Sequence, residues 1–371
     1  IAMGENNMDR AEKILGNCFA MQIYISLALT AVLLLFGRSL LLAFGASENT
    51  IDYAVRYMRI YAAGTLFVEL TLSMNMFITA QGFAKTGMFS VLIGAAMNII
   101  LDPIFIFGFN MGVEGAALAT IVSQGVSCAW VLSFLFGRRT FLCIRRENLA
   151  LRAGIILPCL ALGLASFIMQ ASESVISVCF NSSLLKYGGD VAVGAMTILT
   201  SVMQFAMLPL QGLGQGAQPI ISYNYGAKNA ARVKDAFFLL LKISLCYSTL
   251  LWACIQLFPQ AFVGLFTTDA ALIAFTRPAL RVYCAVLLLF GIQIACQMAF
   301  TSIGSAKSSI AVAVVRKFVL LIPLIYLLPA IFTADKTMAV YLAEPAADFI
   351  AITFTCILFS VQFRKSLKKI A

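Results

Sequence analysis

The sequence contains no histidine, and only 11% of its residues are charged. The missing histidine excludes the zinc-protease motifs and the proton relays that depend on an imidazole. The low charge excludes a soluble domain, in which about a quarter of the residues are charged. The ten cysteines form no C-x-x-C pair, so they are interpreted as packing residues rather than as disulfides or metal ligands.

Hydrophobic residues make up 61% of the chain, and the mean hydropathy is +0.96. Long apolar runs of about eighteen or more residues indicate membrane-spanning helices. The sequence lacks the short alternating strands of a membrane barrel. We therefore predict an all-α membrane protein with ten spanning helices. They are expected near residues 17–44, 54–80, 87–109, 113–136, 154–185, 191–222, 236–265, 279–303, 309–332 and 338–361.

One polar loop occurs twice in the chain. The motif Gly226-x-x-Asn229-x-x-Arg232 is preceded, 222 residues earlier, by Gly4-x-x-Asn7-x-x-Arg10. The same shift pairs Arg59 with Arg281, Tyr61 with Tyr283, Thr79 with Thr301, Gly82 with Gly304 and Lys85 with Lys307. One ungapped register that matches so many residue types indicates a tandem repeat.

The repeat predicts two lobes. We expect an N-terminal lobe at residues 1–136, a basic cytoplasmic linker at 137–153 and a C-terminal lobe at 154–371. The second copy has two apolar segments ahead of its polar loop, so about seventy residues, enough for two spanning helices, are expected before residue 1. The chain would then hold ten helices of twelve, four and six in the two lobes. An even number of helices separates the loops, so the six-helix lobes should lie parallel, related by a pseudo-two-fold axis around a cleft.

Most of the 26 Lys and Arg residues fall on the side of the membrane that carries Gly4–Lys13. The positive-inside rule assigns that side to the cytoplasm. We interpret the net charge of +10 as a result of topology and of attraction to membrane lipids, and expect no nucleic-acid partner. The linker is interpreted as a solvated tether that carries orientation charges.

Two carboxylates deep in apolar segments are candidate ion-binding groups. Asp102 follows Asn98 by one helical turn and precedes Pro103, while Glu173 adjoins a row of polar residues. A charge inside a span costs about 2.5–3.5 kcal/mol at the bilayer centre, so each carboxylate should be paired, neutral or functional. Asn98 is expected to hold a protonated Asp102; a polar pair at a helix kink is the alternative. Glu69 has no repeat counterpart, and its role stays open.

Amide and hydroxyl residues recur at helical spacing in several spans. Because polar groups are costly against lipid, these rows are expected to face protein or water. Both the lining of a substrate cavity and hydrogen bonding between helices are compatible with the pattern. The candidate cavity residues are Asn75, Gln170, Ser174, Ser177, Asn181, Gln204, Gln211, Gln293 and Gln297.

Opposite charges lie in the last two spans. Arg316 and Lys317 occupy one apolar segment, and Glu344 and Asp348 occupy the next. Because a buried charge needs a partner, we predict an ion pair between Arg316 and Asp348, acting as a gate or as a structural bond.

Two stretches resemble the multidrug and toxic compound extrusion (MATE) family, in its branch of bacterial multidrug exporters. The first is N-I-I-L-D-P-I-F-I-F followed by M-G-V-E-G-A-A-L-A-T, within Asn98–Thr120, and the second is Q-G-A-Q-P-I-I-S-Y-N-Y-G-A, at Gln215–Ala227. The resemblance covers the whole chain as helices three to twelve of the family's twelve. A functional acid that some relatives carry in the first helix therefore has no position here.

The resemblance implies a cofactor-free antiporter in the bacterial cytoplasmic membrane. It implies export of cationic or lipophilic compounds in exchange for H⁺ or Na⁺, with the drug and the coupling cation competing for cavity carboxylates. In this sequence Asp102 and Glu173, with Asn98, match that role. We expect a monomer that contacts membrane lipids and small-molecule substrates.

Two other functions have less support in the sequence. A lipid-linked oligosaccharide flippase of the same superfamily would need several cations in its cleft to hold a pyrophosphate. Its in-span bases would be Lys242, Arg316 and Lys317, which are few. An intramembrane enzyme has little support without histidine and without aspartates at a recognisable protease spacing. The sequence therefore favours a transporter, not an enzyme.

Overall fold

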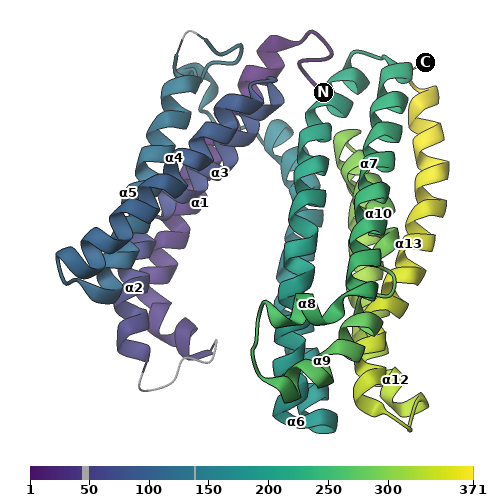
Figure 1. Cartoon of the computed structure of the whole chain (residues 1–371). Helices are drawn as coiled ribbons and strands as arrows, with labels where there is room; N and C mark the ends of the chain where they lie inside the picture. The colour runs from purple at the N-terminus through teal and green to yellow at the C-terminus, as the bar shows by residue number, and fades with distance from the viewer. Residues whose placement is uncertain (44–49, 138, 371) are drawn as a thin grey trace. The chain divides into compact units, whose positions relative to one another are not determined.

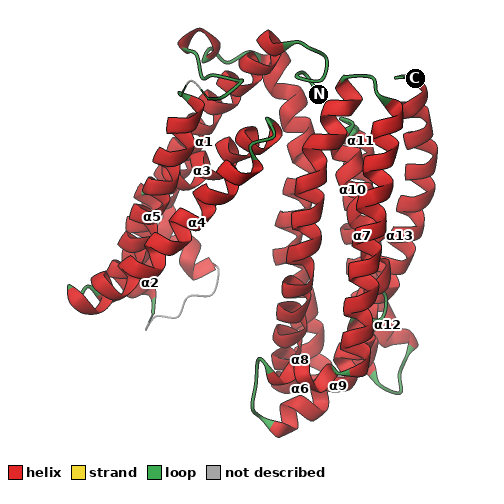
Figure 2. Cartoon of the chain, turned by 45° about the horizontal axis from the view of Figure 1, so that its top comes forward, coloured by secondary structure: helices red, strands yellow, loops and turns green. Residues whose placement is uncertain are grey.

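The computed structural model describes residues 1–43, 50–137 and 139–370. Within these residues all regular structure is helical, and no strand occurs (Figure 2). The expected end of the first span at residue 44, and Arg138 of the linker, lie outside the described residues. Contacts divide the chain into two units. The N-terminal unit is Asn7–Leu157 with Ala2, and the C-terminal unit is Pro158–Ala371 with Ile1 and Met3–Asn6.

The N-terminal unit is a bundle of antiparallel helices (Figure 1). Two of them form one segment that bends by 52° at Gly64, and another ends in a π-helical turn after Pro103. A proline removes a backbone donor, which is a recognised cause of such breaks. The elements are α1 (Met8–Ala43), α2 (Ile51–Ala63), α3 (Thr65–Ala80), α4 (Ala84–Pro103), η1 (Ile104–Gly108), α5 (Gly112–Leu135) and the short η2 (Arg146–Asn148).

The C-terminal unit packs α6, α9, α12 and α13 around one apolar core, and α7, α10 and α13 around a second (Figure 1). Phe180, Phe300 and Tyr341 are its largest fully buried side chains. The elements are α6 (Ala153–Gly226), α7 (Ala230–Leu257), α8 (Pro259–Gly264), α9 (Ala270–Tyr283), η3 (Leu287–Leu289), α10 (Phe290–Ser302), α11 (Ala306–Val314), η4 (Val315–Leu321), α12 (Ile322–Ile331) and α13 (Lys336–Lys368).

Seven described helices are long and apolar enough to cross a membrane, and two bent pairs raise the number to nine. The expectation of ten counted α6 as two spans, and α6 is indeed non-helical at Gly189, where φ is 63° and ψ is −160°. The expected end of the seventh span was wrong, because α7 stops at Leu257 instead of continuing to residue 265. Pro259 opens a separate short helix, α8, because proline is tolerated in a first turn but not in a helix interior.

Local geometry recurs at the 222-residue shift found in the sequence. Asn7 Oδ1 accepts a hydrogen bond from Arg10 N at 2.9 Å, and Asn229 Oδ1 accepts one from Arg232 N at 3.1 Å. Such contacts satisfy free amides at helix starts. Positive φ angles also recur at this shift: Asn6 (58°) with Lys228 (55°), and Gly82 (90°) with Gly304 (74°). The same turns therefore occur in both repeats.

The linker is docked on the N-terminal unit. The Asn17 side chain, which is 1% exposed, donates to Asn148 O at 3.0 Å and accepts from Arg152 N at 2.7 Å. Gln81 Oε1, at the end of α3, accepts from Leu142 N at 3.0 Å. The expectation of a solvated tether was wrong, because buried amide side chains of α1 and α3 take up backbone groups of the linker.

Candidate functional site

In the N-terminal unit, α4 carries the Asn98–Asp102 pair. Asn98 Nδ2 donates to Asp102 Oδ1 at 3.3 Å, and both residues are half-buried. Pro103 follows directly, and the next turn, η1, is π-helical. Single π-helical turns occur frequently at functional sites. The two residues that were expected to cooperate therefore lie in contact, at the point where the helix changes its pitch.

In the C-terminal unit, α6 presents a row of polar side chains on its outer face. Gln170, Ser174, Ser177 and Asn181 are all exposed. The opposite face buries Ile176, Phe180 and Leu184 in the apolar core. The period of an α-helix separates the two sets. In the second half of α6, the candidate residues Gln204 and Gln211 are also exposed.

Glu173 lies beside this row and forms an ion pair. Its Oε1 is 2.7 Å from Lys317 Nζ, and the two side chains differ in exposure, at 57% for Glu173 and 4% for Lys317. Lys317 comes from η4, a π-helical segment inside the spanning segment that runs from α11 to α12. Sequence reasoning gave Lys317 no partner, and the only signal for one was a lysine inside an apolar run.

Arg316, the residue before Lys317, pairs with two carboxylates of α13. Its Nε donates to Asp348 Oδ1 at 2.6 Å, and its Nη2 is 3.5 Å from Glu344 Oε1. All three side chains are at most 10% exposed. The expected contact between Arg316 and Asp348 is present, and Glu344 is a second partner that the sequence did not assign. The C-terminal unit thus holds one charged cluster, in which Arg316, Lys317, Glu344 and Asp348 are buried and Glu173 is exposed.

Three other candidate amides lie inside the units. Gln293 and Gln297 of α10 are 4% and 8% exposed, and Gln297 Nε2 donates to Ser309 Oγ of α11 at 2.6 Å. The Asn75 side chain of α3 packs against Gly87 of α4. This geometry fits the alternative of packing and hydrogen bonding between helices better than it fits a wall exposed to substrate. A role of these three residues in a cavity stays a prediction.

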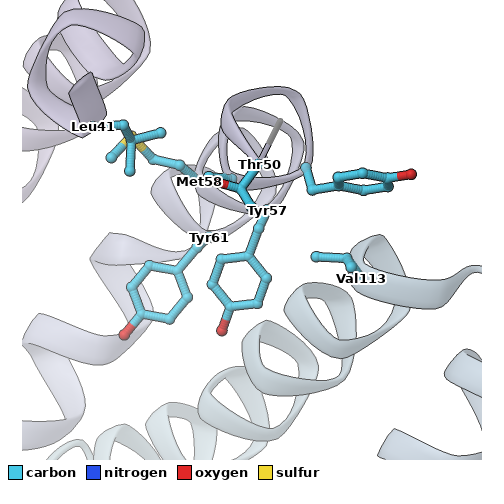
Figure 3. Close-up of a pocket in the computed structure, with 8 residues that line it drawn as sticks. Leu41, Thr50, Tyr57, Met58, Tyr61 and Val113 are labelled. Atoms are coloured by element: carbon cyan, nitrogen blue, oxygen red, sulfur yellow. The ribbon is translucent and has the colours of Figure 1, made fainter. Parts of the chain in front are cut away.

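A shallow pocket of about 470 Å³ lies between α1, α2 and α5 of the N-terminal unit (Figure 3). Tyr57 and Tyr61 form part of its wall, with ring centroids 6.0 Å apart and planes 13° apart. Leu41, Met58 and Val113 complete an apolar lining. The pocket contains none of the candidate cavity residues. Sequence reasoning missed it because aromatic residues at helical spacing are equally typical of packing.

The described ranges contain no candidate metal site. No three His, Cys, Asp or Glu side chains converge there as a metal site would require. In the charged cluster of the C-terminal unit, the Lys317 ammonium and the Arg316 guanidinium lie beside the carboxylates.

A model of the MatE family matches residues 1–104 and 165–327 of the chain. Among curated proteins, the chain is similar to the multidrug export protein MepA of Staphylococcus aureus (strain NCTC 8325 / PS 47). The two are 27% identical over 311 residues, which is 84% of this chain and 68% of MepA. MepA of Staphylococcus haemolyticus (strain JCSC1435) is 26% identical over 326 residues, which is 87% of this chain and 71% of that protein.

Solved structures give the same fold. The chain superposes with a TM-score of 0.91 on an outward-facing multidrug resistance MATE family transporter of the MOP superfamily, at 24% identity. The TM-score is also 0.91 against a MOP superfamily transporter from Pyrococcus furiosus Vc1 (DSM3638), at 23% identity. Each comparison covers 99% of this chain and 82% of the other chain. A likeness at this identity establishes the architecture of the helices.

Proposed function

The chain belongs to the MatE family of membrane transporters, and on that premise we propose that it exports cationic or lipophilic compounds in exchange for H⁺ or Na⁺. It is a multi-pass membrane protein and not an enzyme. We place it in the bacterial cytoplasmic membrane as a monomer. Its substrates would be small organic cations, the class that a carboxylate inside an apolar surface selects by charge.

The exposed carboxylate of Glu173 is the observation that carries this proposal. It lies within the apolar helix α6, on the same outer face as Gln170, Ser174 and Ser177, and its side chain is 57% exposed. A carboxylate in a span is costly, and it is found where it faces protein or a wet cavity. A row of amides and hydroxyls with one acid offers a weak, adaptable site for organic cations, which suits a transporter that must also release them.

Asp102 is the second group in the proposal. It belongs to the N-terminal unit, is half-buried and is held by Asn98. A carboxyl that exchanges its proton or ion needs access to water and a neighbour that stabilises one of its states. Asn98 supplies such a neighbour, because its amide donates to the carboxylate oxygen. We assign Asp102 and Asn98 to binding of the coupling ion.

A flippase for pyrophosphate-linked lipids is less well supported. Its substrate carries several negative charges and would need cations that are free to bind them. Arg316 and Lys317 are each neutralised by carboxylates within 3.5 Å. A phosphate at Arg316 would have to displace buried carboxylates, which is costly, and a phosphate at Lys317 would have to displace Glu173.

Dye efflux tests the proposal. Vesicles that contain the full protein and are loaded with ethidium should release the dye under an imposed gradient of pH or of Na⁺, and the gradient that drives release identifies the coupling ion. Asp102→Asn and Glu173→Gln together should abolish this efflux. Asp235→Asn, an exposed acid of α7, is the matched control and should leave efflux unchanged. Unchanged efflux in the double variant would refute the assignment of both carboxylates.

A further inference from the structure

Lys317 and Glu173 form an asymmetric ion pair. The ammonium is nearly enclosed, with 4% of its side chain exposed, whereas the carboxylate that it contacts at 2.7 Å is 57% exposed. In the part of the chain that the structure describes, Glu173 supplies the one ion pair to Lys317. A buried ammonium needs a counter-ion, because its desolvation is otherwise uncompensated. The charge of Lys317 therefore depends on a carboxylate that other cations can reach.

The charges around Lys317 come from four elements. Glu173 lies on α6, and Arg316 precedes Lys317 in η4 and holds Glu344 and Asp348 of α13. Lys317 also interacts electrostatically with Glu344. At the end of α9, Tyr283 interacts electrostatically with Glu344, Asp348 and Glu173, and the next residue, Cys284, interacts with Glu344. Phe290 of α10 covers the Arg316 guanidinium at 5.1 Å and adds no charge. Glu344 and Asp348 thus belong mainly to Arg316.

The two cations of η4 differ in chemistry. A guanidinium keeps its proton under all conditions that proteins meet, whereas an amine gives up its proton when burial or a missing counter-ion disfavours the charged form. Lys317 is thus the one cation of this cluster that can become neutral. Its single exposed counter-ion makes this change possible from outside the cluster.

We propose that an organic cation binding at Glu173 displaces the Lys317 ammonium, and that Lys317 then releases one proton to water. The inference rests on the proposed function and names the proton-carrying residue of the C-terminal unit. The ion pair between Glu173 and Lys317 breaks, an ion pair between Glu173 and the organic cation forms, and the proton leaves the Lys317 nitrogen. The net charge of the cluster is the same before and after, so the exchange adds no buried charge.

The exchange works in both directions. Protonation of Lys317 lowers the affinity of Glu173 for the organic cation. By linkage, binding of the organic cation lowers the affinity of Lys317 for its proton by the same factor. A face of the membrane that is more acidic therefore favours the ion pair and releases the drug. A less acidic cytoplasm favours drug binding. Such a site couples export of one cation to entry of one proton.

Proton release on binding tests the proposal. The full protein, purified in detergent with little buffer, is mixed with ethidium, and a pH indicator reports the protons set free. We expect about one proton to be released per bound ethidium. The ethidium Kd should fall about tenfold for each unit by which the pH is raised, as long as Lys317 is protonated in the protein without ethidium. Lys317→Arg keeps the positive charge, but the guanidinium cannot release its proton. This variant should set no proton free and should bind ethidium with a Kd that does not change with pH.

Further variants make the test independent of one substitution. Lys317→Gln has no charge from the start, so it should bind ethidium without proton release and more tightly than the wild type at low pH. Lys242→Arg, an exposed in-span lysine of α7, is the matched control and should behave as the wild type. Proton release of wild-type size in Lys317→Arg or Lys317→Gln would overturn the assignment. Failure of the wild type to bind ethidium at all would instead contradict the proposed function.

Discussion

Gln22 of α1 donates a hydrogen bond to the Glu69 carboxylate of α3, and both residues are half-buried. The 222-residue shift relates this pair to Ser244 and Gly291, where a Cβ on Gly291 would lie 2.5 Å from the Ser244 backbone. The same helix crossing is thus bridged by a polar pair in one repeat and by close backbone contact in the other. This explains why Glu69 has no acidic counterpart in the second repeat. At the position of Gly291 the neighbouring helix comes too close for a side chain, whereas at Glu69 the side chain bridges the two helices.

The Gln22–Glu69 pair predicts a compensating double variant. Gln22→Leu should lower the free energy of unfolding by about 1–3 kcal/mol, because a half-buried carboxylate loses its hydrogen-bond donor. Adding Glu69→Leu should restore part of this loss, since two apolar partners need no hydrogen bond. Unfolding followed in detergent by a denaturant titration measures both effects. A double variant less stable than Gln22→Leu alone would show that the hydrogen bond is not the dominant interaction at this crossing.

The buried cluster predicts an asymmetry between the partners of Arg316. Asp348→Ala should destabilise the protein by about 3–5 kcal/mol, because a buried guanidinium loses its closest carboxylate. Glu344→Ala should cost less, since its contact with Arg316 is longer, at 3.5 Å. Chemical denaturation of each purified variant gives the comparison. Arg316→Met added to Asp348→Ala should recover stability, and equal losses for both acids would contradict the ranking.

Interactions set by local spacing could be predicted from the sequence. Asn98 and Asp102 are one helical turn apart, so any helix brings them together, and their hydrogen bond measures 3.3 Å. The repeat was predictable for the same reason, since its turns depend on residues such as Gly82 and Gly304. The ion pair between Arg316 and Asp348 could be predicted because buried charges need a partner, and the two residues lie in successive helices.

The partner of Glu173 could not be predicted in this way. Neighbouring residues on an α-helix point about 100° apart. The π-helical geometry of η4 changes that angle, and the spacing of hydrophobic residues in the sequence does not reveal where a π-helical turn occurs. Sequence alone therefore does not show that Arg316 reaches α13 while Lys317 reaches α6. The docked linker was missed for a similar reason, because the burial of Asn17 depends on tertiary packing.

The positive-φ glycines predict matched losses in the two repeats. Gly82→Ala and Gly304→Ala should each cost about 1–2 kcal/mol, because an L side chain is strained at φ angles of 90° and 74°. No atom lies within 4 Å of a Cβ placed on Gly82, so its cost comes from the backbone alone. Gly212→Ala is the control: it has similar open space in the interior of α6 and should be neutral or slightly stabilising. Thermal unfolding midpoints should separate the first two variants from the third.

The docked linker predicts a specific pattern of proteolysis. Asn17 joins Asn148 and Arg152 through its buried amide, at 3.0 and 2.7 Å, so Asn17→Leu removes both anchors without changing a charge. Trypsin should then cleave at Arg145, Arg146 and Arg152 at least tenfold faster than in the wild type, if opening of the linker costs about 1.4 kcal/mol less. Asn224→Leu, which loses one bond to Ile220 O on an exposed face of α6, should keep the wild-type cleavage rate. Gel densitometry measures the cleavage rates. Equal rates in the wild type and in Asn17→Leu would mean that other contacts hold the linker, such as the hydrogen bond between Gln81 and Leu142.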